Sequence, residues 1–187
     1  KDINLNEDFI VAVSGGPDSL ALSFLAKIYS LKKKLNVKYF IIDHKLRYNS
    51  TKETKLVKQL LKKLSVDLRV LTWIGKKPKS NIQSLARSKR YKLLTEEAIK
   101  LKFRNILLGH HRDDLIENFF MRILRGSGLN GIISFDEKTR YRNINIIRPL
   151  LKFSKNDLES ISKKVFGMYV DDPSNKNNHF KRVKIRN

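Results

Sequence analysis

Short runs of apolar residues recur along the chain, and longer segments with helical spacing of apolar residues separate them. Such runs indicate buried strands, whereas apolar residues three or four apart indicate a helix that packs on a core. Helices are predicted at Ser50–Leu64, where Ser50 and Glu53 have capping-box spacing, and at Asn81–Leu101. The predicted strands are Phe9–Val13, Val37–Asp43, Asp67–Trp73, Asn105–Gly109 and Ile144–Leu150.

Strict alternation of strands and helices favours a parallel sheet with helices on both faces. We therefore expect an α/β fold with a doubly wound, five-stranded, Rossmann-like parallel sheet. With strands numbered along the chain, the expected order across the sheet is 3-2-1-4-5. Ligands of such sheets bind outside the carboxyl ends of the strands, so the segments that follow each strand are the first candidates for a site.

The segment "SGGPDS" follows the first predicted strand and precedes a helical pattern. Glycine readily takes positive φ, which can turn backbone N–H groups toward an anion at a helix N-terminus. The segment lacks the lysine of a Walker A loop, which disfavours a kinase or GTPase, and an ordinary strand-to-helix turn is the alternative. The predicted phosphate cradle comprises Ser14, Gly15, Gly16, Pro17, Asp18 and Ser19.

The segment Gly109–Gly131 follows the fourth predicted strand and is the richest in candidate chemistry. If a helix begins near Asp113, then Asp113, Asp114 and Glu117 share one face of it. Carboxylates hold Mg²⁺ together with ATP phosphates, so these residues form a candidate magnesium cluster. Acidic residues in a first turn also complement the helix dipole, and that structural interpretation stays open.

Three weaker signals accompany these segments. His110 and His111 would suit a transition metal, but no downstream ligand spacing supports one. The hexapeptide Gly126–Gly131 matches the dinucleotide fingerprint but follows a helix rather than a strand, so we set it aside. The segment Asp43–Asn49 follows the second strand, and a solvated turn explains it nearly as well as a site does.

The composition restricts the class of protein. The chain has 187 residues, no cysteine and 40 Lys and Arg against 18 Asp and Glu, a net charge of +22. This charge is typical of proteins that meet nucleic acid, although a bias toward Lys, Asn and Ile would also produce it. The absence of cysteine excludes disulfides and thiolate chemistry. Without a signal peptide or a long apolar run, we expect a cytoplasmic protein without membrane contact.

Two basic segments contain no acidic residue and carry an aromatic side chain. They are Lys76–Lys92, with Tyr91, and Lys176–Asn187, with Phe180. Basic side chains of this kind contact nucleic-acid phosphates, and aromatic rings stack on unpaired bases. A solvated charged face is the alternative for each segment.

Several motifs occur in an order that resembles the tRNA(Ile)-lysidine synthetases, a family of the PP-loop ATP pyrophosphatase superfamily. The resemblance runs from Phe9 to about Arg186 and is carried by "SGGPDS", "DHKLR", "NIQSLARSKRY", "GHHRDDLIENFFMRILRGSGLNGI", "RPLL" and "DPSN". It implies ATP-dependent ligation of lysine to C2 of the cytidine at the first anticodon position of an isoleucine tRNA. The reaction would pass through an adenylated tRNA and release pyrophosphate and AMP.

The resemblance also implies roles for individual residues. The "SGGPDS" residues, with Asp43 and His44, would bind ATP, and Asp18 and Asp114 would hold Mg²⁺. Catalysis would depend on Asp18, Asp113, Asp114 and Glu117, which orient metal or the free lysine substrate. We expect tRNA contacts from Arg87, Arg90, Lys181 and Arg182, with ATP phosphates as the alternative target of Arg87 and Arg90.

We expect residues 1–150 to form the PP-loop catalytic domain. Residues 151–187 would be a helical and basic extension of it that leads toward any further domains. Another PP-loop enzyme acting on tRNA, such as a thiolase, or an amidotransferase synthetase is an alternative. A non-catalytic RNA-binding module is another, and it explains the charge but not the glycine loop with its acidic cluster.

Overall fold

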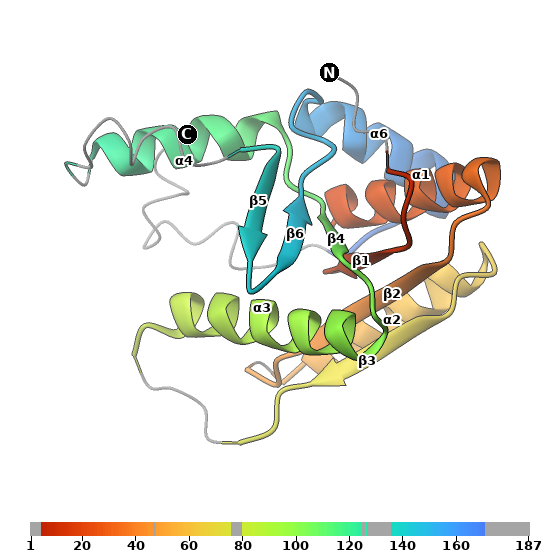
Figure 1. Cartoon of the computed structure of the whole chain (residues 1–187), viewed down its shortest axis with the longest axis horizontal. Coiled ribbons are helices and arrows are strands. Elements are labelled where there is room, and N and C mark those ends of the chain that lie inside the picture. The colour runs from red at the N-terminus through yellow and green to blue at the C-terminus, as the bar shows by residue number, and fades with distance from the viewer. Residues whose placement is uncertain (1–4, 47, 76–79, 125, 127–135, 171–187) are drawn as a thin grey trace.

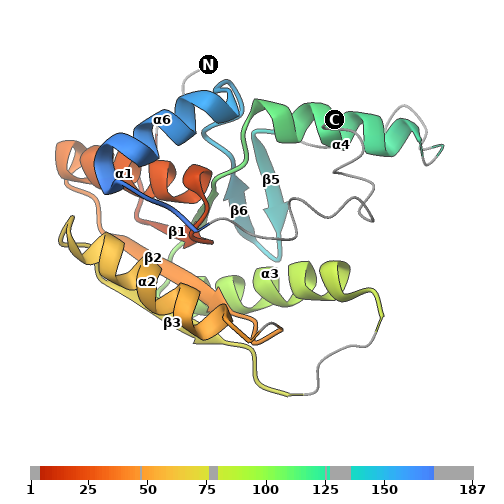
Figure 2. The same ribbon diagram turned by 180° about the vertical axis from the view of Figure 1, so that it is seen from behind.

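The computed structural model describes residues 5–46, 48–75, 80–124, 126 and 136–170. Helices and strands alternate through most of it, as Figures 1 and 2 show from opposite sides. The strands are β1 (Phe9–Val13), β2 (Val37–Asp43), β3 (Leu68–Thr72), β4 (Asn105–Leu108), β5 (Lys138–Tyr141) and β6 (Ile144–Ile147). The helices are α1 (Pro17–Lys33), α2 (Ser50–Lys62), α3 (Ile82–Lys100), α4 (Arg112–Ile123) and α6 (Lys155–Phe166).

The strands form one sheet in the order β3-β2-β1-β4-β6-β5, in which every pair is parallel except β5 with β6. This confirms the α/β class and the predicted order of the five strands. The prediction of five strands was wrong by one, because β5 adds an antiparallel edge strand. Its sequence "KTRY" is polar, and its side chains alternate between exposed and half-buried positions.

Two apolar cores cover the two faces of the sheet. Phe9, Val11 and Val13 of β1 belong to the core that includes residues of α1, α2 and α6. Ile10 and Ala12 point to the other face, where the core includes residues of α3. Because adjacent side chains of β1 enter opposite cores, the strand is buried along its whole length, which explains its continuous apolar run.

Helix α6 is tied directly to the first helix of the chain. The two helices lie side by side in both views (Figures 1 and 2), and Leu158 and Phe166 enter the same core as α1. The Ser162 hydroxyl donates to the Pro17 carbonyl over 2.6 Å at the start of α1. Residues after 150 therefore help to position the segment that follows β1.

The predicted capping box of α2 is not formed. The N-cap residue is Asn49, without a side-chain cap, and the Ser50 hydroxyl donates instead to the Asp43 carboxylate over 2.9 Å. Asp43 competes successfully for this hydroxyl because it is buried at the end of β2 and needs hydrogen-bond donors. Sequence spacing alone does not reveal this longer-range partner.

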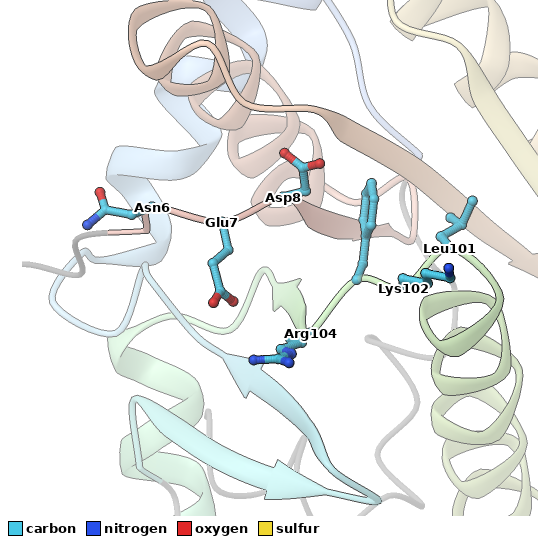
Figure 3. A pocket seen from close by; sticks show the side chains of 7 residues that line it. Asn6, Glu7, Asp8, Leu101, Lys102 and Arg104 are labelled. Atoms are coloured by element: carbon cyan, nitrogen blue, oxygen red, sulfur yellow. The ribbon is translucent and has the colours of Figure 1, made fainter.

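A hollow at the amino ends of β1 and β4 is lined by polar residues that include Asn6, Lys102 and Arg104 (Figure 3). Its acidic residues already have structural partners. Glu7 accepts a hydrogen bond from the Asn105 side chain over 3.2 Å, and Asp8 accepts one from an amide N–H over 2.8 Å. Because this edge is opposite the carboxyl ends of the strands, we place the candidate site elsewhere.

Candidate functional site

The loop between β1 and α1 contains two glycines with different backbone conformations. Gly15 has φ of +91°, and a Cβ there would lie 2.6 Å from Val57 Cγ2 of α2. Gly16, the N-cap of α1, is extended with φ of −70°, and a Cβ there would meet only the Ser14 hydroxyl, at 3.9 Å. Of the two predicted left-handed glycines, only Gly15 uses that freedom, and the expectation for Gly16 was wrong.

The Ser19 hydroxyl is the centre of the loop. Its Oγ accepts the N–H groups of Ser14 and Gly15, each over 3.1 Å, and donates to the Gly16 carbonyl over 3.0 Å. The Ser14 hydroxyl also donates to it, over 3.1 Å. These bonds fold the loop around a buried side chain, so Ser19 shapes the cradle from within. The start of α1, beside the loop, is where the helix dipole favours an anion.

Asp18 lies in the first turn of α1 with its side chain 26% exposed. Its Oδ1 is buried and has no hydrogen-bond partner among the residues that the structure describes. Burial is the main cause that raises the pKa of Asp18 to about 6; the charge of Asp114 adds to the rise, and His111 and Lys155 oppose it. A buried carboxylate oxygen without a donor is well suited to a cation, and carboxylates are the protein ligands that Mg²⁺ accepts.

Helix α4 buries one acidic residue and exposes apolar ones, the reverse of a normal surface helix. Glu117 is only 5% exposed, whereas Leu115, Ile116 and Phe119 on the outer side are 38%, 47% and 44% exposed. Complementing the helix dipole does not require a carboxylate to be buried, and burial of a charge costs stability. The structure therefore places Glu117 on the inner side of α4, and its role stays a prediction.

The two first-turn acids of α4 connect it to neighbouring backbone. Asp113 Oδ2 accepts the Lys155 N–H at the start of α6 over 3.1 Å, and Asp114 Oδ2 accepts the His111 N–H over 3.1 Å. Within the described residues, no three Asp, Glu, His or Cys side chains are gathered as a metal centre. Since Mg²⁺ held together with ATP phosphates needs only one or two carboxylates, the candidate cluster of Asp113, Asp114 and Glu117 stays a prediction.

The structure brings Asp114 close to Asp18 through His111, which the sequence offered only as a weak transition-metal candidate together with His110. His111 is 2% exposed, and its Nε2 lies 3.5 Å from Asp114 Oδ2 and 3.8 Å from Asp18 Oδ2. Its Nδ1 accepts the Asp113 N–H over 3.2 Å as the N-cap of α4. The sequence signal for this role was its place directly after a strand and before the acidic turn.

Gly109 allows β4 and α1 to approach at this point. A Cβ there would lie 3.1 Å from three backbone atoms of Asp18 and Ser19. Since backbone atoms cannot rotate away as a side chain can, a larger residue would displace the first turn of α1. Gly109 thus helps to set the separation between Asp18 and the start of α4.

Asp43 and His44 lie at the carboxyl end of β2, next to the end of β1. Asp43 accepts the Lys45 N–H and the hydroxyls of Ser50 and Thr51 over 2.8–3.0 Å. Burial acts to raise the pKa of Asp43, but these donors outweigh it and leave the pKa below its ordinary value. The His44 ring packs edge-on against Trp73, with the centroids 6.0 Å apart. Asp43 thus binds the start of α2 to the carboxyl end of β2, at the edge of the sheet where the site is predicted.

The predicted tRNA-binding residues fall into two groups. Arg87 and Arg90 lie on α3, which follows the carboxyl end of β3, and the Arg87 guanidinium lies 5.1 Å from the centre of the Tyr91 ring. Arg87 also donates to the Tyr91 hydroxyl over 3.2 Å. Lys181 and Arg182 lie outside the described residues.

The helices and strands of the chain match those of a solved structure. The U34-tRNA thiolase NcsA from Methanococcus maripaludis, solved with its 4Fe-4S cluster, superposes with a TM-score of 0.78. It is 17% identical, and the match covers 91% of this chain and 60% of the thiolase. This similarity concerns the fold alone. No helix among the described residues is long and apolar enough to cross a membrane.

Sequence comparison gives a closer match. The tRNA(Ile)-lysidine synthase of Orientia tsutsugamushi is 39% identical over 97% of this chain and 41% of the relative. The synthases of Bradyrhizobium diazoefficiens and Wolbachia pipientis are 37% and 38% identical over 95% and 97% of this chain, and 50% and 43% of their own. The chain thus spans about half the length of these curated relatives.

A family model described as the PP-loop domain matches residues 2–187. The match includes the loop around Ser19, the first turn of α1 with Asp18, and the start of α4. Together with the parallel sheet and the relatives, it establishes the family. The chain belongs to the PP-loop domain family.

Proposed function

We propose that this chain is the catalytic part of a tRNA(Ile)-lysidine synthase that uses ATP to join lysine to an isoleucine tRNA. The observation that carries the proposal is the Asp18 carboxylate beside the PP-loop, whose buried Oδ1 lacks a hydrogen-bond partner within the described part of the chain. A triphosphate with its cation would supply the missing partner. The names of relatives at 37–39% identity over almost the whole chain support the choice of reaction.

In the proposed reaction, the C2 oxygen of the anticodon cytidine attacks the α-phosphate of ATP, and the bond to the β-phosphate breaks. Pyrophosphate leaves, and the C2 oxygen becomes part of an adenylate. The lysine ammonium first loses one proton, and the resulting neutral amine attacks C2. The adduct then loses a second proton to solvent, and the bond from C2 to oxygen breaks as AMP departs with the oxygen. Adenylation is needed because the unmodified oxygen is a poor leaving group.

Each part of the site has a role in this proposal. The PP-loop, Ser14–Ser19, would receive the departing pyrophosphate at the start of α1. Asp18 and Asp114 would hold Mg²⁺, which offsets negative charge on the phosphates when it is bound. Glu117, buried one turn inside α4, would hold the lysine ammonium, and Asp113 would orient the same helix through its bond to α6. Asp43 and His44 would border the adenylate.

The tRNA would be bound through basic residues. A net charge of +22 favours contact with phosphates, and Arg87, Arg90, Lys181 and Arg182 are the residues we propose for it. We do not favour a thiolase activity, because this chain has no cysteine to carry sulfur or a cluster. A module that only binds RNA would not need a carboxylate buried beside the PP-loop.

Pyrophosphate release tests the proposal. We expect the protein to release pyrophosphate from ATP only when isoleucine tRNA is present, and Asp18→Asn to lower that rate by about 10² or more. Asp67→Asn is the matched control, because Asp67 is 78% exposed and lies before β3, away from the site. A wild-type protein that binds the tRNA without releasing pyrophosphate would support an RNA-binding module instead.

A further inference from the structure

His111 is buried between elements that are far apart in the sequence. It is the N-cap of α4, and its ring also reaches the first turn of α1, because Nε2 lies 3.8 Å from Asp18 Oδ2. Asp114, in the first turn of α4, lies 3.5 Å from the same nitrogen. The imidazole is therefore in contact with carboxylates of both helices.

The hydrogen bonds of the ring determine which nitrogen carries the proton. Nδ1 accepts the N–H of Asp113 over 3.2 Å, so this nitrogen is unprotonated. A neutral imidazole then carries its proton on Nε2, the nitrogen that faces Asp18 and Asp114. The backbone of α4 thus fixes the tautomer that presents an N–H to the two carboxylates.

Histidine is an unusual choice for an N-cap. Asn, Asp, Ser and Thr cap a helix better, and any of them would satisfy the Asp113 N–H. Their side chains are too short to place a second polar atom where Nε2 lies. The position at 111 therefore combines two tasks: one ring nitrogen caps α4, and the other contacts the carboxylates.

We propose that His111 is a positioning residue. It holds the Asp18 and Asp114 carboxylates in a fixed position relative to each other, so that both can bind a divalent cation together with ATP. This inference rests on the proposed function, since it assigns a supporting residue to the same site. His111 contacts neither substrate nor the reacting atoms. Its effect is to fix the relative position of α1 and α4, as residues behind metal ligands do.

Two substitutions separate the two tasks of the ring. His111→Asn keeps an oxygen near the place of Nδ1, so it retains the cap but loses the N–H toward Asp18 and Asp114. His111→Gln extends an N–H toward the place of Nε2 but is a poor N-cap. We expect His111→Asn to melt like the wild type and to lower tRNA-dependent pyrophosphate release by about 10–100-fold. We expect His111→Gln to melt at a lower temperature but to retain more activity than His111→Asn.

A measurement without substrate tests the geometry itself. In protein with ¹⁵N-labelled histidine, the His111 signals, assigned by their loss in His111→Asn, should show a bare Nδ1 and a protonated Nε2. A second measurement titrates Mg²⁺ with ATP and isoleucine tRNA present. His111→Asn should need about 10–100-fold more Mg²⁺ than the wild type for half-maximal pyrophosphate release.

Three results would overturn the proposal: a proton on Nδ1, wild-type activity and Mg²⁺ dependence in His111→Asn, or activity in His111→Gln no higher than in His111→Asn. Failure of the proposed function is distinguishable from these results. In that case the wild-type protein itself would release no pyrophosphate, while the tautomer measurement and the melting temperatures would still decide the role of His111.

Discussion

The two adjacent glycines of the PP-loop should differ sharply in their tolerance of alanine. At Gly15, φ of +91° costs a non-glycine residue about 1–3 kcal/mol. The added Cβ would lie 2.6 Å from Val57 Cγ2, a fully buried side chain that cannot move away, and such overpacking costs about another 1–3 kcal/mol. We therefore expect Gly15→Ala to lower the free energy of unfolding by about 2–6 kcal/mol.

Gly16→Ala is the matched control. Its φ of −70° suits alanine, and the nearest atom to a new Cβ is 3.9 Å away. The expected loss is about 1 kcal/mol or less, because alanine is a poorer N-cap than glycine. Urea unfolding followed by circular dichroism measures both variants, and the slope of the transition shows whether the unfolded state has changed.

A double-mutant cycle separates the two causes at Gly15. Val57→Ala removes Cγ2, so Gly15→Ala combined with Val57→Ala should be less destabilised than the sum of the single changes, by about 1–3 kcal/mol. The backbone strain remains in the double variant. Equal losses for Gly15→Ala and Gly16→Ala, or additive effects with Val57→Ala, would refute this reasoning.

The remaining predictions concern charge. Asp18→Asn should abolish both pyrophosphate release and lysine transfer, whereas Glu117→Gln should spare part of the pyrophosphate release and lower lysine transfer; parallel losses in separate assays would refute this division. The folded-state pKa of Asp18 is raised from 3.8 to about 6, so folding favours its neutral carboxyl form. The stability that this group contributes to the folded state is therefore fully present below pH 4 and is lost as the pH rises through 6. Asp18→Asn should therefore be more stable than the wild type above pH 6, by up to about 3 kcal/mol, and not below pH 4; an unchanged difference in urea unfolding from pH 4 to 8 would contradict this. Affinity for isoleucine tRNA should fall steeply between about 50 and 200 mM salt. An affinity that does not change with salt would show that the +22 charge reflects amino-acid composition rather than phosphate contacts.

Much of the sheet was predictable because its strands are buried on both faces. The run Phe9–Val13 is continuous and apolar for that reason, and the structure confirms its bounds. The edge strand β5 gives no such signal, since half of its side chains face solvent and it pairs on one side only. Its pairing depends on the turn at Arg142 and Asn143, both at positive φ, which neither residue type demands.

The place of the site was predictable, but the internal contacts were not. Strand-to-helix segments of a parallel sheet meet at one edge, so Asp18, Asp43 and Asp114 were expected near one another. The roles of Ser19 within the loop and of His111 between α1 and α4 depend on distances of 3–4 Å, and His111 and Asp18 are 93 residues apart in the sequence. Spacing along the chain contains no such information, which is also why the two glycines looked equivalent.

Transfer of labelled lysine to tRNA is the direct test of the proposed ligase activity. Wild-type protein would be incubated with ATP, Mg²⁺, labelled lysine and an isoleucine tRNA transcript that has cytidine at the first anticodon position. We expect the label to enter the tRNA only when ATP is present. Incorporation should be lost with Asp18→Asn and with a transcript that has uridine at that position. Pyrophosphate release with this tRNA but no label in it would contradict the claim, and would assign the chain to a different reaction of the PP-loop family.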